Sequence, residues 1–322
     1  TPESILPMPK DLPKNRYGLA LWLTNPEHPL TARVAVNRMW QNIYGTGLVK
    51  TSEDFGNQGE LPSHPKLLDY LAIQFVESGW DVKKLMKAMV MTATYQQNSI
   101  ATEEHREKDL ENRFLARGPA NRLTAEMMRD NALAASGLLK EAIGGKSVKP
   151  YQPYGLWEIN NTYYTADSTD DVYKRSLYVL IKRSVPNPTL ATFDGNSRSS
   201  CVIRRQITNT PLQALVILND PTYVEASKVL GEKMTLMKDP KNAINLTYLK
   251  LTGKTPKPQV LQILMDFRTK EIENFKINPA KTKGWLQAGY YKYNKELEPY
   301  IVASNAVVAN LIMNSDATLM KR

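Results

Sequence analysis

The chain has one cysteine, Cys201, and only three histidines among its 322 residues. A single cysteine excludes an internal disulfide, and three histidines isolated in the sequence do not form a cluster of metal ligands. The C-x-x-C-H signature of c-type haem attachment is absent, as are the P-loop, G-x-G-x-x-G, G-x-S-x-G and H-E-x-x-H motifs. We therefore expect neither a metal ion nor a cofactor, and no motif identifies a reaction.

Long apolar runs are also missing. No run reaches the roughly 18 apolar residues that a transmembrane helix requires, so we expect no such helix. The chain begins Thr-Pro-Glu without a charged-then-apolar leader, which is typical of a processed or partial polypeptide.

Positively charged residues, in contrast, are abundant. The chain has 42 Lys and Arg residues and 32 Asp and Glu residues, which gives a net charge of +10. Such a balance favours acidic partners, including anionic glycans, lipid headgroups, nucleic acid or an acidic subunit. The alternative is a solvated basic surface, which we favour because the lysines after Lys228 are scattered. No helix-turn-helix, zinc or stacking-sheet signature is present, so we expect no nucleic-acid partner.

The apolar residues recur mainly with helical spacing, which predicts a mainly α, irregular multi-helix domain with long loops and at most a small β element. We expect a linker or extended arm at residues 1–15, an N-terminal helical lobe at 16–143, an irregular aromatic and arginine-rich block at 144–220, and a C-terminal helical lobe at 221–322, the lobes forming one domain. Predicted helices lie at 17–24, 29–44, 124–139, 221–234 and 300–313, and others begin near Pro65, Asp81, Pro211 and Pro258. The only predicted strand is Ser176–Ile181, and a lysine-rich irregular connection is expected before Pro299.

One face of the helix at 29–44 carries Arg33, Asn37 and Trp40, together with Tyr44. An arginine, an amide and aromatic rings stacked over three turns can bind a sugar or an anion. The alternative, which we favour, is an arginine bonded to loop carbonyls and a tryptophan packed in the core.

The helix at 124–139 brings Glu126, Arg129 and Asp130 close to Arg122. Two carboxylates one turn apart suit the acid–base chemistry of a glycosidase. Neighbouring arginines instead favour a structural ion-pair network with lowered carboxylate pKa values. Further along, Trp157 lies in a cluster with several tyrosines, which suits carbohydrate stacking, a protein-binding hot spot or packing between lobes.

The block from Arg183 to Asn219 has the densest unusual chemistry, and it holds five further candidates for ligand or partner binding. These are Arg183, Arg198, Arg204, Arg205 and Asp194. We predict that the arginines hold Asp194 and the loop carbonyls, because a guanidinium has five donors in a rigid fork. Cys201 lies beside these arginines, which would favour a thiolate, but a lone buried cysteine is the interpretation we prefer.

The same block contains KRSVPNPTLATFD and RRQITNTPLQALVILNDPTYVEA, and LALWLTNPEHPLTARVAVNRMWQ lies near the start. These stretches resemble the PSD-type domain of unknown function, the C-terminal domain of planctomycete-style cytochrome-associated exported proteins, and the resemblance covers nearly all of Tyr17 to Asp316. It implies an exported protein, periplasmic or at the cell surface in association with the outer membrane. The implied partners are other subunits or fused domains, cytochrome-like ones among them. The resemblance supplies no reaction and no catalytic residue.

We predict a non-catalytic scaffold or interaction module of an exported multiprotein assembly that also binds acidic polysaccharide. The alternative is an enzyme domain that acts on polysaccharide, or that takes part in electron transfer with a cytochrome-like partner domain. The two differ in whether residues such as Arg183, Asp194 and Glu126 converge in an open cleft or in a buried network.

Overall fold

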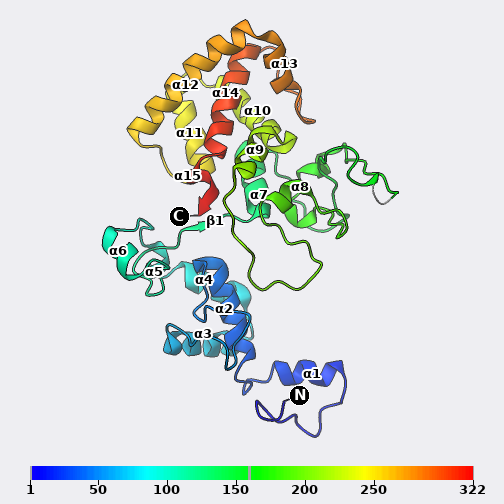
Figure 1. The fold of residues 1–322 in the computed structure, drawn as a ribbon, viewed down its shortest axis with the longest axis vertical. Coiled ribbons are helices and arrows are strands. Elements are labelled where there is room, and N and C mark those ends of the chain that lie inside the picture. The colour runs from blue at the N-terminus through cyan, green and yellow to red at the C-terminus, as the bar shows by residue number, and fades with distance from the viewer. Residues whose placement is uncertain (1, 159–160, 322) are drawn as a thin grey trace. The chain divides into compact units, whose positions relative to one another are not determined.

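The computed structural model describes residues 2–158 and 161–321, and its regular structure is almost entirely helical (Figure 1). The mainly α fold class expected from the sequence is confirmed. In the described residues the strands are short: β1 (Asn121–Arg122) and β2 (Met320–Lys321) pair in a two-stranded sheet. Contacts divide the chain into two compact units, one ending at Asn121 but including Lys321, the other running from Arg122 to Met320. The division falls earlier in the chain than the lobe boundary expected at residue 143.

Unit 1 is built on three helices that pack their apolar faces together. Its helices are α1 (Arg16–Leu23), α2 (Thr31–Tyr44), α3 (Pro65–Glu77), α4 (Val82–Val90), α5 (Ala93–Gln96) and α6 (Glu103–Lys108). Val36 and Trp40 of α2, Phe75 of α3 and Met89 of α4 are buried in one core. Asp81 begins α4 by accepting the N–H of Lys84 at 2.9 Å, as its position before the apolar run predicted.

Unit 2 has more and longer helices, several of which were not expected. They are α7 (Ala125–Ser136), the 3-10 turns η2 (Asp170–Tyr173) and η3 (Ser176–Tyr178), α8 (Pro188–Thr192), α9 (Pro211–Asn219), α10 (Pro221–Thr235), α11 (Pro240–Thr252), α12 (Pro258–Ile277), α13 (Pro279–Gln287), α14 (Pro299–Met313) and α15 (Asp316–Leu319). Seven of these described helices, α8 to α14, have proline in the first turn. Proline suits that position because its fixed φ matches the helix and its missing N–H would have no partner there.

The centre of unit 2 is the antiparallel pair α10 and α14, with α12 packed beside α14 (Figure 1). The two helices approach closely because Gly231 faces the backbone of α14. A Cβ at this position would lie 2.5 Å from the nitrogen of Ala306 and 2.6 Å from the carbonyl oxygen of Val302. The small residue Ala306 of α14 is completely buried at this contact. Close packing therefore holds α10 rigidly, and α10 carries most of the polar groups described below.

The strand predicted at Ser176–Ile181 does not form. The segment begins with η3 and then makes a single parallel bridge between Val179 and Val148. Two hydrogen bonds of 2.8 Å define the bridge, from Val148 N–H to the Tyr178 carbonyl and from Leu180 N–H to the Val148 carbonyl. The next donor in a parallel ladder would be the N–H of residue 150, which is a proline and has none. The ladder therefore ends after one bridge.

The lysine-rich connection expected before Pro299 is also partly helical. Residues Pro279–Gln287 form α13, which follows α12 after a sharp corner at Asn278. Asn278 has an extended φ of −122° and ψ of 73°, so it ends one helix and precedes the first turn of the next. The irregular connection is thereby restricted to residues 288–298. This correction matters because α13 and the connection border both pockets described below.

Candidate functional site

The buried amide of Asn37 serves the structure of unit 1. Its Nδ2 donates to the carbonyl of Val49 at 3.0 Å and to the hydroxyl of Ser52 at 3.1 Å, and its Oδ1 accepts the Val49 N–H at 2.8 Å. The side chain is completely buried. All of its contacts therefore tie the loop at 45–63 to α2, and we assign no ligand to it.

The two other candidates on this face of α2 have similar local contacts. Trp40 is buried, and its ring stacks on that of Tyr44 with 4.0 Å between the centroids. Arg33 donates from Nε to Asp69 at 2.7 Å and from Nη1 to the carbonyl of Pro29. The three candidate residues of α2 therefore have different roles and do not form one site. Trp40 packs in the core, Asn37 attaches the loop, and Arg33 forms an ion pair at the surface.

The arginines predicted to hold Asp194 do not do so. Arg183, Arg198 and Arg204 are exposed. The carboxylate of Asp194 instead accepts the backbone N–H of Thr208 at 2.8 Å and the Thr208 hydroxyl at 3.0 and 2.9 Å. Thr208 lies close because the chain folds back after residue 194, and its two adjacent donors satisfy the carboxylate locally. The central loop is therefore closed by hydrogen bonds from uncharged donors to this carboxylate.

The two carboxylates of α7 do not form an acid–base pair. Glu126 receives a bidentate contact from Arg205, with Nη1 at 2.7 Å and Nη2 at 3.0 Å, and Asp130 accepts the N–H of Ser176 at 2.7 Å. Partial burial alone would raise the pKa of Glu126, but the hydrogen bonds and charge of Arg205 outweigh it and lower that pKa. A carboxyl group held ionised in this way is a poor general acid at neutral pH.

Trp157 lies in an aromatic contact beside a lysine. The Nζ of Lys182 is 4.2 Å from the centroid of the Trp157 ring, and the ring of Tyr164 is 5.0 Å from it at 58°. The hydroxyl of Tyr164 donates to the carbonyl of Pro150. Trp157 thus anchors the irregular segment after α7, whereas the nearby Tyr154 and Tyr163 are largely exposed.

Arg129 of α7 is buried, with 4% of its surface exposed, and it bonds the chain within and just after η2. Its Nη1 donates to the carbonyl of Lys174 at 2.9 Å and to the hydroxyl of Ser176 at 3.2 Å, and its Nη2 donates to the carbonyl of Val172. Among the described residues its Nε has no hydrogen-bond partner. A buried guanidinium with one unused donor is a candidate for contact with a ligand or water.

Arg129 lines a pocket of about 300 Å³ within unit 2, which we call the Arg129 pocket. The other lining residues come from four separate segments, and most are aromatic or proline. They are Pro150, Tyr151, Val172, Tyr173, Pro221, Thr222, Glu225, Gly289 and Tyr290. A concave, largely apolar and aromatic lining with a few convergent polar groups is the usual composition of a ligand site.

Glu225 of α10 is the acidic group of this pocket. Its Oε1 accepts the hydroxyl of Tyr173 at 2.8 Å and the backbone N–H of Tyr291 at 2.5 Å. The backbone approaches so closely that a Cβ at Gly289 would lie 2.2 Å from the Glu225 carboxyl carbon, and Gly289 has φ of 71°. Only glycine fits there without displacing the carboxylate.

One turn further along α10, Lys228 is completely buried and holds the same loop. Its Nζ donates to the carbonyls of Leu286, Ala288 and Tyr291 at 3.4, 2.5 and 2.6 Å. Burial lowers the pKa of Lys228, while the negative charge of Glu225 acts against that shift. We call Lys228, Glu225 and the 286–291 backbone that they bond the α10 clamp.

Two tyrosines at the Arg129 pocket, Tyr173 and Tyr164, stay protonated at neutral pH. Burial raises the pKa of Tyr173 above its ordinary value, and the hydrogen bond to Glu225 raises it further. Burial also raises the pKa of Tyr164, which bonds the lining residue Pro150. Both hydroxyls therefore act as hydrogen-bond donors, and the pocket presents one guanidinium and one carboxylate.

The sequence alone identified Arg129 but not its neighbours in the pocket. Tyr173, Glu225 and Tyr290 are far apart in the chain and belong to no motif. A signal did exist for Glu225, because it interrupts the apolar face of a helix with a carboxylate. The buried Lys228 gave the same signal three residues later, yet lysine and glutamate at helical spacing usually indicate a solvated face.

A family of proteins of unknown function, PSD1 (DUF1553), matches residues 15–268 of the chain. The chain belongs to this family, as its sequence resemblance predicted. No curated protein and no solved structure matches it. The family carries no assigned activity, so functional assignment depends on the geometry of the pockets.

Two searches of the described residues bear on the class of site. In residues 2–158 and 161–321 we find no group of three or more His, Cys, Asp or Glu side chains that could hold a metal ion. Within the same residues, none of the helices combines the length and apolar character needed to span a bilayer. Cys201 is exposed, so the buried position preferred for it above is wrong.

Proposed function

We propose that this protein is a non-catalytic binding module whose Arg129 pocket takes a segment of carbohydrate. The observation that carries the proposal is the pocket of about 300 Å³ that Tyr151 and Tyr290 line together with Arg129 and Glu225. Aromatic faces pack against the apolar C–H faces of sugar rings, and charged groups beside them bond hydroxyls or a carboxylate. Both of these tyrosines are about two-fifths exposed, so their rings are accessible.

The charges favour an acidic carbohydrate over a neutral one. The chain carries a net charge of +10, which attracts anionic polymers over distances beyond contact. Arg129 lines the pocket, its buried Nε has no hydrogen-bond partner among the described residues, and guanidinium groups bind carboxylates well. Glu225 is already bonded to Tyr173 and Tyr291, so two donors partly neutralise the one group that would repel an acidic sugar.

Binding without cleavage agrees better with the lining of this pocket. Glycoside hydrolysis generally requires two carboxyl groups on opposite sides of the scissile bond. Among the residues that line the pocket, Glu225 is the only carboxylate. The nearest candidates of α7, Glu126 and Asp130, are bonded elsewhere. We therefore place the polysaccharide-cleaving alternative second.

The setting of this module is part of the proposal and follows from the family resemblance alone. We propose an exported, cell-surface assembly in which the chain docks other subunits or fused domains, cytochrome-like ones among them. In that setting a basic module with a sugar pocket would attach the assembly to acidic surface polysaccharide.

The test is calorimetric titration with oligogalacturonate as the acidic probe and maltohexaose as the neutral one. We expect Tyr290→Ala and Tyr151→Ala each to weaken oligogalacturonate binding about fivefold or more, as loss of an aromatic contact generally does. Tyr154→Ala is the matched control, because Tyr154 lies in the same irregular segment and is almost fully exposed outside the pocket.

Two results would overturn the proposal. One is the absence of saturable binding to either probe. The other is equal weakening by Tyr154→Ala and Tyr290→Ala, which would indicate a diffuse electrostatic surface. Tighter binding of maltohexaose would keep the pocket as a sugar site but remove the preference for acidic carbohydrate.

A further inference from the structure

A second pocket of unit 2, which we call the lysine pocket, has a volume of about 480 Å³. It lies between the end of α12, α13, the connection that follows and the start of α14. Phe275 and Leu286 form its apolar floor, and both are at least 95% buried. Tyr293 and Tyr300 add aromatic walls. The volume lies within the range of about 300–1,000 Å³ that is typical of small-molecule sites.

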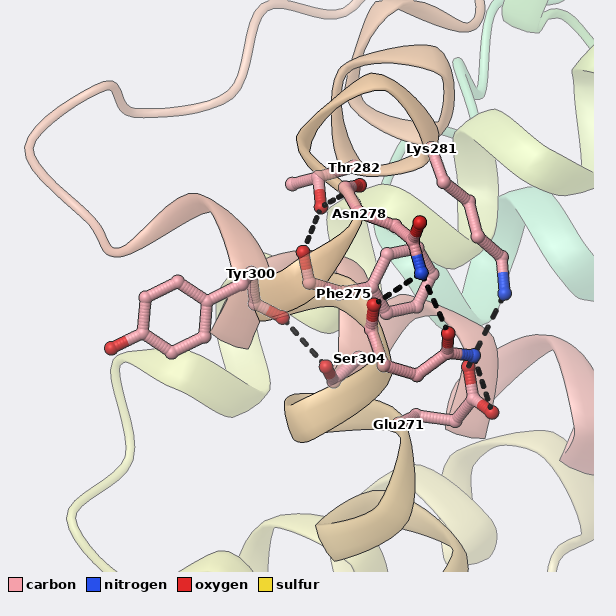
Figure 2. Close-up of polar contacts among 8 residues, drawn as sticks. Glu271, Phe275, Asn278, Lys281, Thr282, Tyr300 and Ser304 are labelled. Atoms are coloured by element: carbon pink, nitrogen blue, oxygen red, sulfur yellow. Dashed lines mark hydrogen bonds and ion pairs between the residues drawn. The ribbon is translucent and has the colours of Figure 1, made fainter.

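The corner between α12 and α13 is fixed by its own hydrogen bonds, as Figure 2 shows. Thr282 of α13 donates its hydroxyl to the carbonyl of Phe275 at 2.8 Å and to that of Asn278 at 3.2 Å. Asn278 donates to the carbonyl of Asn274 at 3.1 Å. The α10 clamp holds the other side, through Lys228 and the carbonyl of Leu286. The pocket is therefore preformed, which reduces the entropy cost of binding.

The charged groups that line this pocket all have the same sign. They are Lys276, Lys283, Lys292 and Lys295, and all four are exposed. No Asp or Glu is among the lining residues. The nearby carboxylate of Glu271 is directed to Lys281, whose Nζ lies 3.7 Å from it (Figure 2). Lysine stems can cover apolar surface while their ammonium groups stay in water, so the lining combines apolar walls with a cationic rim.

We propose that the lysine pocket binds a single-chain amphiphile with an anionic head group, of the fatty-acid class. The chain packs against Phe275 and Leu286, and the head group meets the lysine rim. A purely ionic ligand would leave the apolar floor in contact with water, and a purely apolar one would make no contact with the four ammonium groups of the rim, so both features point to one molecule with two ends. The pocket shares no lining residue with the Arg129 pocket, and all its lining residues follow residue 268, where the family match ends.

The first experiment measures binding of dodecanoate, butyrate and dodecanol to the whole chain, below the concentration at which the probes self-assemble. We expect saturable binding of dodecanoate and weaker binding of dodecanol, which lacks the charge. Across a series from butyrate to dodecanoate, the affinity should rise about threefold to fourfold per buried methylene until the pocket is full.

The second experiment separates the rim from general charge. Lys283→Glu with Lys295→Glu should weaken dodecanoate binding by about tenfold or more, since two attractions become repulsions. The matched control, Lys257→Glu with Lys270→Glu, makes the same change of net charge at two exposed lysines outside the pocket, one just before α12 and one within it. That control should change the affinity less than about twofold.

The third variant, Gln287→Trp, keeps every charge and fills the pocket from an exposed lining position of α13. It should abolish the dependence of affinity on chain length while leaving the melting temperature close to that of the parent. Equal affinity for dodecanoate and butyrate in the parent would overturn the proposal, as would equal weakening by the two lysine pairs. Binding to anionic vesicles without binding to monomeric dodecanoate would also overturn it, in favour of a membrane surface.

Discussion

The two pockets of unit 2 border the same stretch of backbone, residues 286–291, and differ in charge. The Arg129 pocket presents a guanidinium and a carboxylate among tyrosines, whereas the lysine pocket presents only cations over an apolar floor. Most residues of the first lie within the stretch that matches the family, and all residues of the second lie beyond it. A polar, hydroxyl-rich ligand suits the first lining and an anionic amphiphile suits the second. We therefore expect the same basic chain to recognise two kinds of ligand. The net charge is common to both pockets, so the carboxylates and aromatic rings of each lining determine which ligand binds there.

The α10 clamp connects the two. The backbone between Leu286 and Tyr291 borders both pockets, and Lys228 and Glu225 bond it from the same helix. The two sites therefore depend on one buried lysine for their shape, although they share no lining residue.

The largest expected effect comes from breaking this shared element with Lys228→Met. The change removes the donor for three carbonyls and leaves Glu225 without its nearby buried cation, so we expect a loss of about 3–5 kcal/mol in the free energy of unfolding. Urea unfolding measures it. Binding of oligogalacturonate and of dodecanoate should weaken together.

Lys233→Met is the control for that variant. Lys233 lies on the same helix but is exposed, and it donates to the single carbonyl of Ser136. We expect a loss of about 1 kcal/mol and unchanged affinity at both pockets. If Lys228→Met lowered the affinity at only one pocket, the two sites would be structurally independent.

A second, smaller effect concerns buried and half-buried tyrosines close to the Arg129 pocket, of which Tyr173 alone lines it. Burial raises the pKa values of Tyr164, Tyr173 and Tyr223. A group whose pKa is raised in the folded state stabilises the fold fully below its unfolded pKa, here about 10, and loses that contribution as the pH rises above it. Lys228 has the opposite effect on the pH dependence of stability. Because its pKa is lowered in the folded state, its contribution makes the free energy of unfolding rise as the pH approaches the ordinary lysine pKa.

Tyr223→Phe isolates one of these tyrosines, since Lys228 is the same in variant and parent. The Tyr223 hydroxyl is buried and has no hydrogen-bond partner among the described residues, so its removal should change stability at neutral pH by less than about 1 kcal/mol. Above about pH 10, the variant should lose stability less steeply than the parent, by up to about 1.4 kcal/mol per pH unit. Urea unfolding across this range measures both slopes, and parallel slopes would refute the tyrosine assignment.

Helix content was predictable from sequence because proline so often begins a helix here. The predicted helices that start near Pro65, Pro211, Pro221 and Pro258 all form. Helices also begin at Pro188, Pro240 and Pro279, but they were not predicted because the apolar pattern that follows each of these prolines is weaker. The predicted strand failed for a reason outside its own segment, namely the proline that ends the partner's hydrogen bonds.

The site was less predictable, since side-chain partners depend on tertiary contacts. Arg129 was a candidate on the basis of its helix, but its acceptors are backbone carbonyls of residues 172–174, which no spacing rule identifies. Asp194 was expected to meet arginines and meets Thr208. The Asp194→Ala variant should therefore lower the free energy of unfolding by about 1.5–3 kcal/mol, the range for hydrogen bonds to a charged group, in place of the larger loss expected for a broken buried ion pair.

The smallest expected effect tests whether net charge alone explains either pocket. Arg205→Ala removes one cation without touching a lining residue, because Arg205 pairs with Glu126. Both side chains are about one-third exposed, so solvent screening limits the loss of stability to about 1 kcal/mol or less. The Glu126 pKa is lowered in the folded state, so what stability the pair provides is present at neutral pH and declines as the pH falls through the titration of Glu126. The difference in unfolding free energy between variant and parent should accordingly shrink toward acidic pH.

The affinities of the Arg205→Ala variant for oligogalacturonate and dodecanoate should stay within about twofold of those of the parent at moderate salt. A drop at both pockets that matches the one caused by Lys283→Glu with Lys295→Glu would mean that the overall positive field attracts the ligands, and the contrast between the two linings would then carry no specificity.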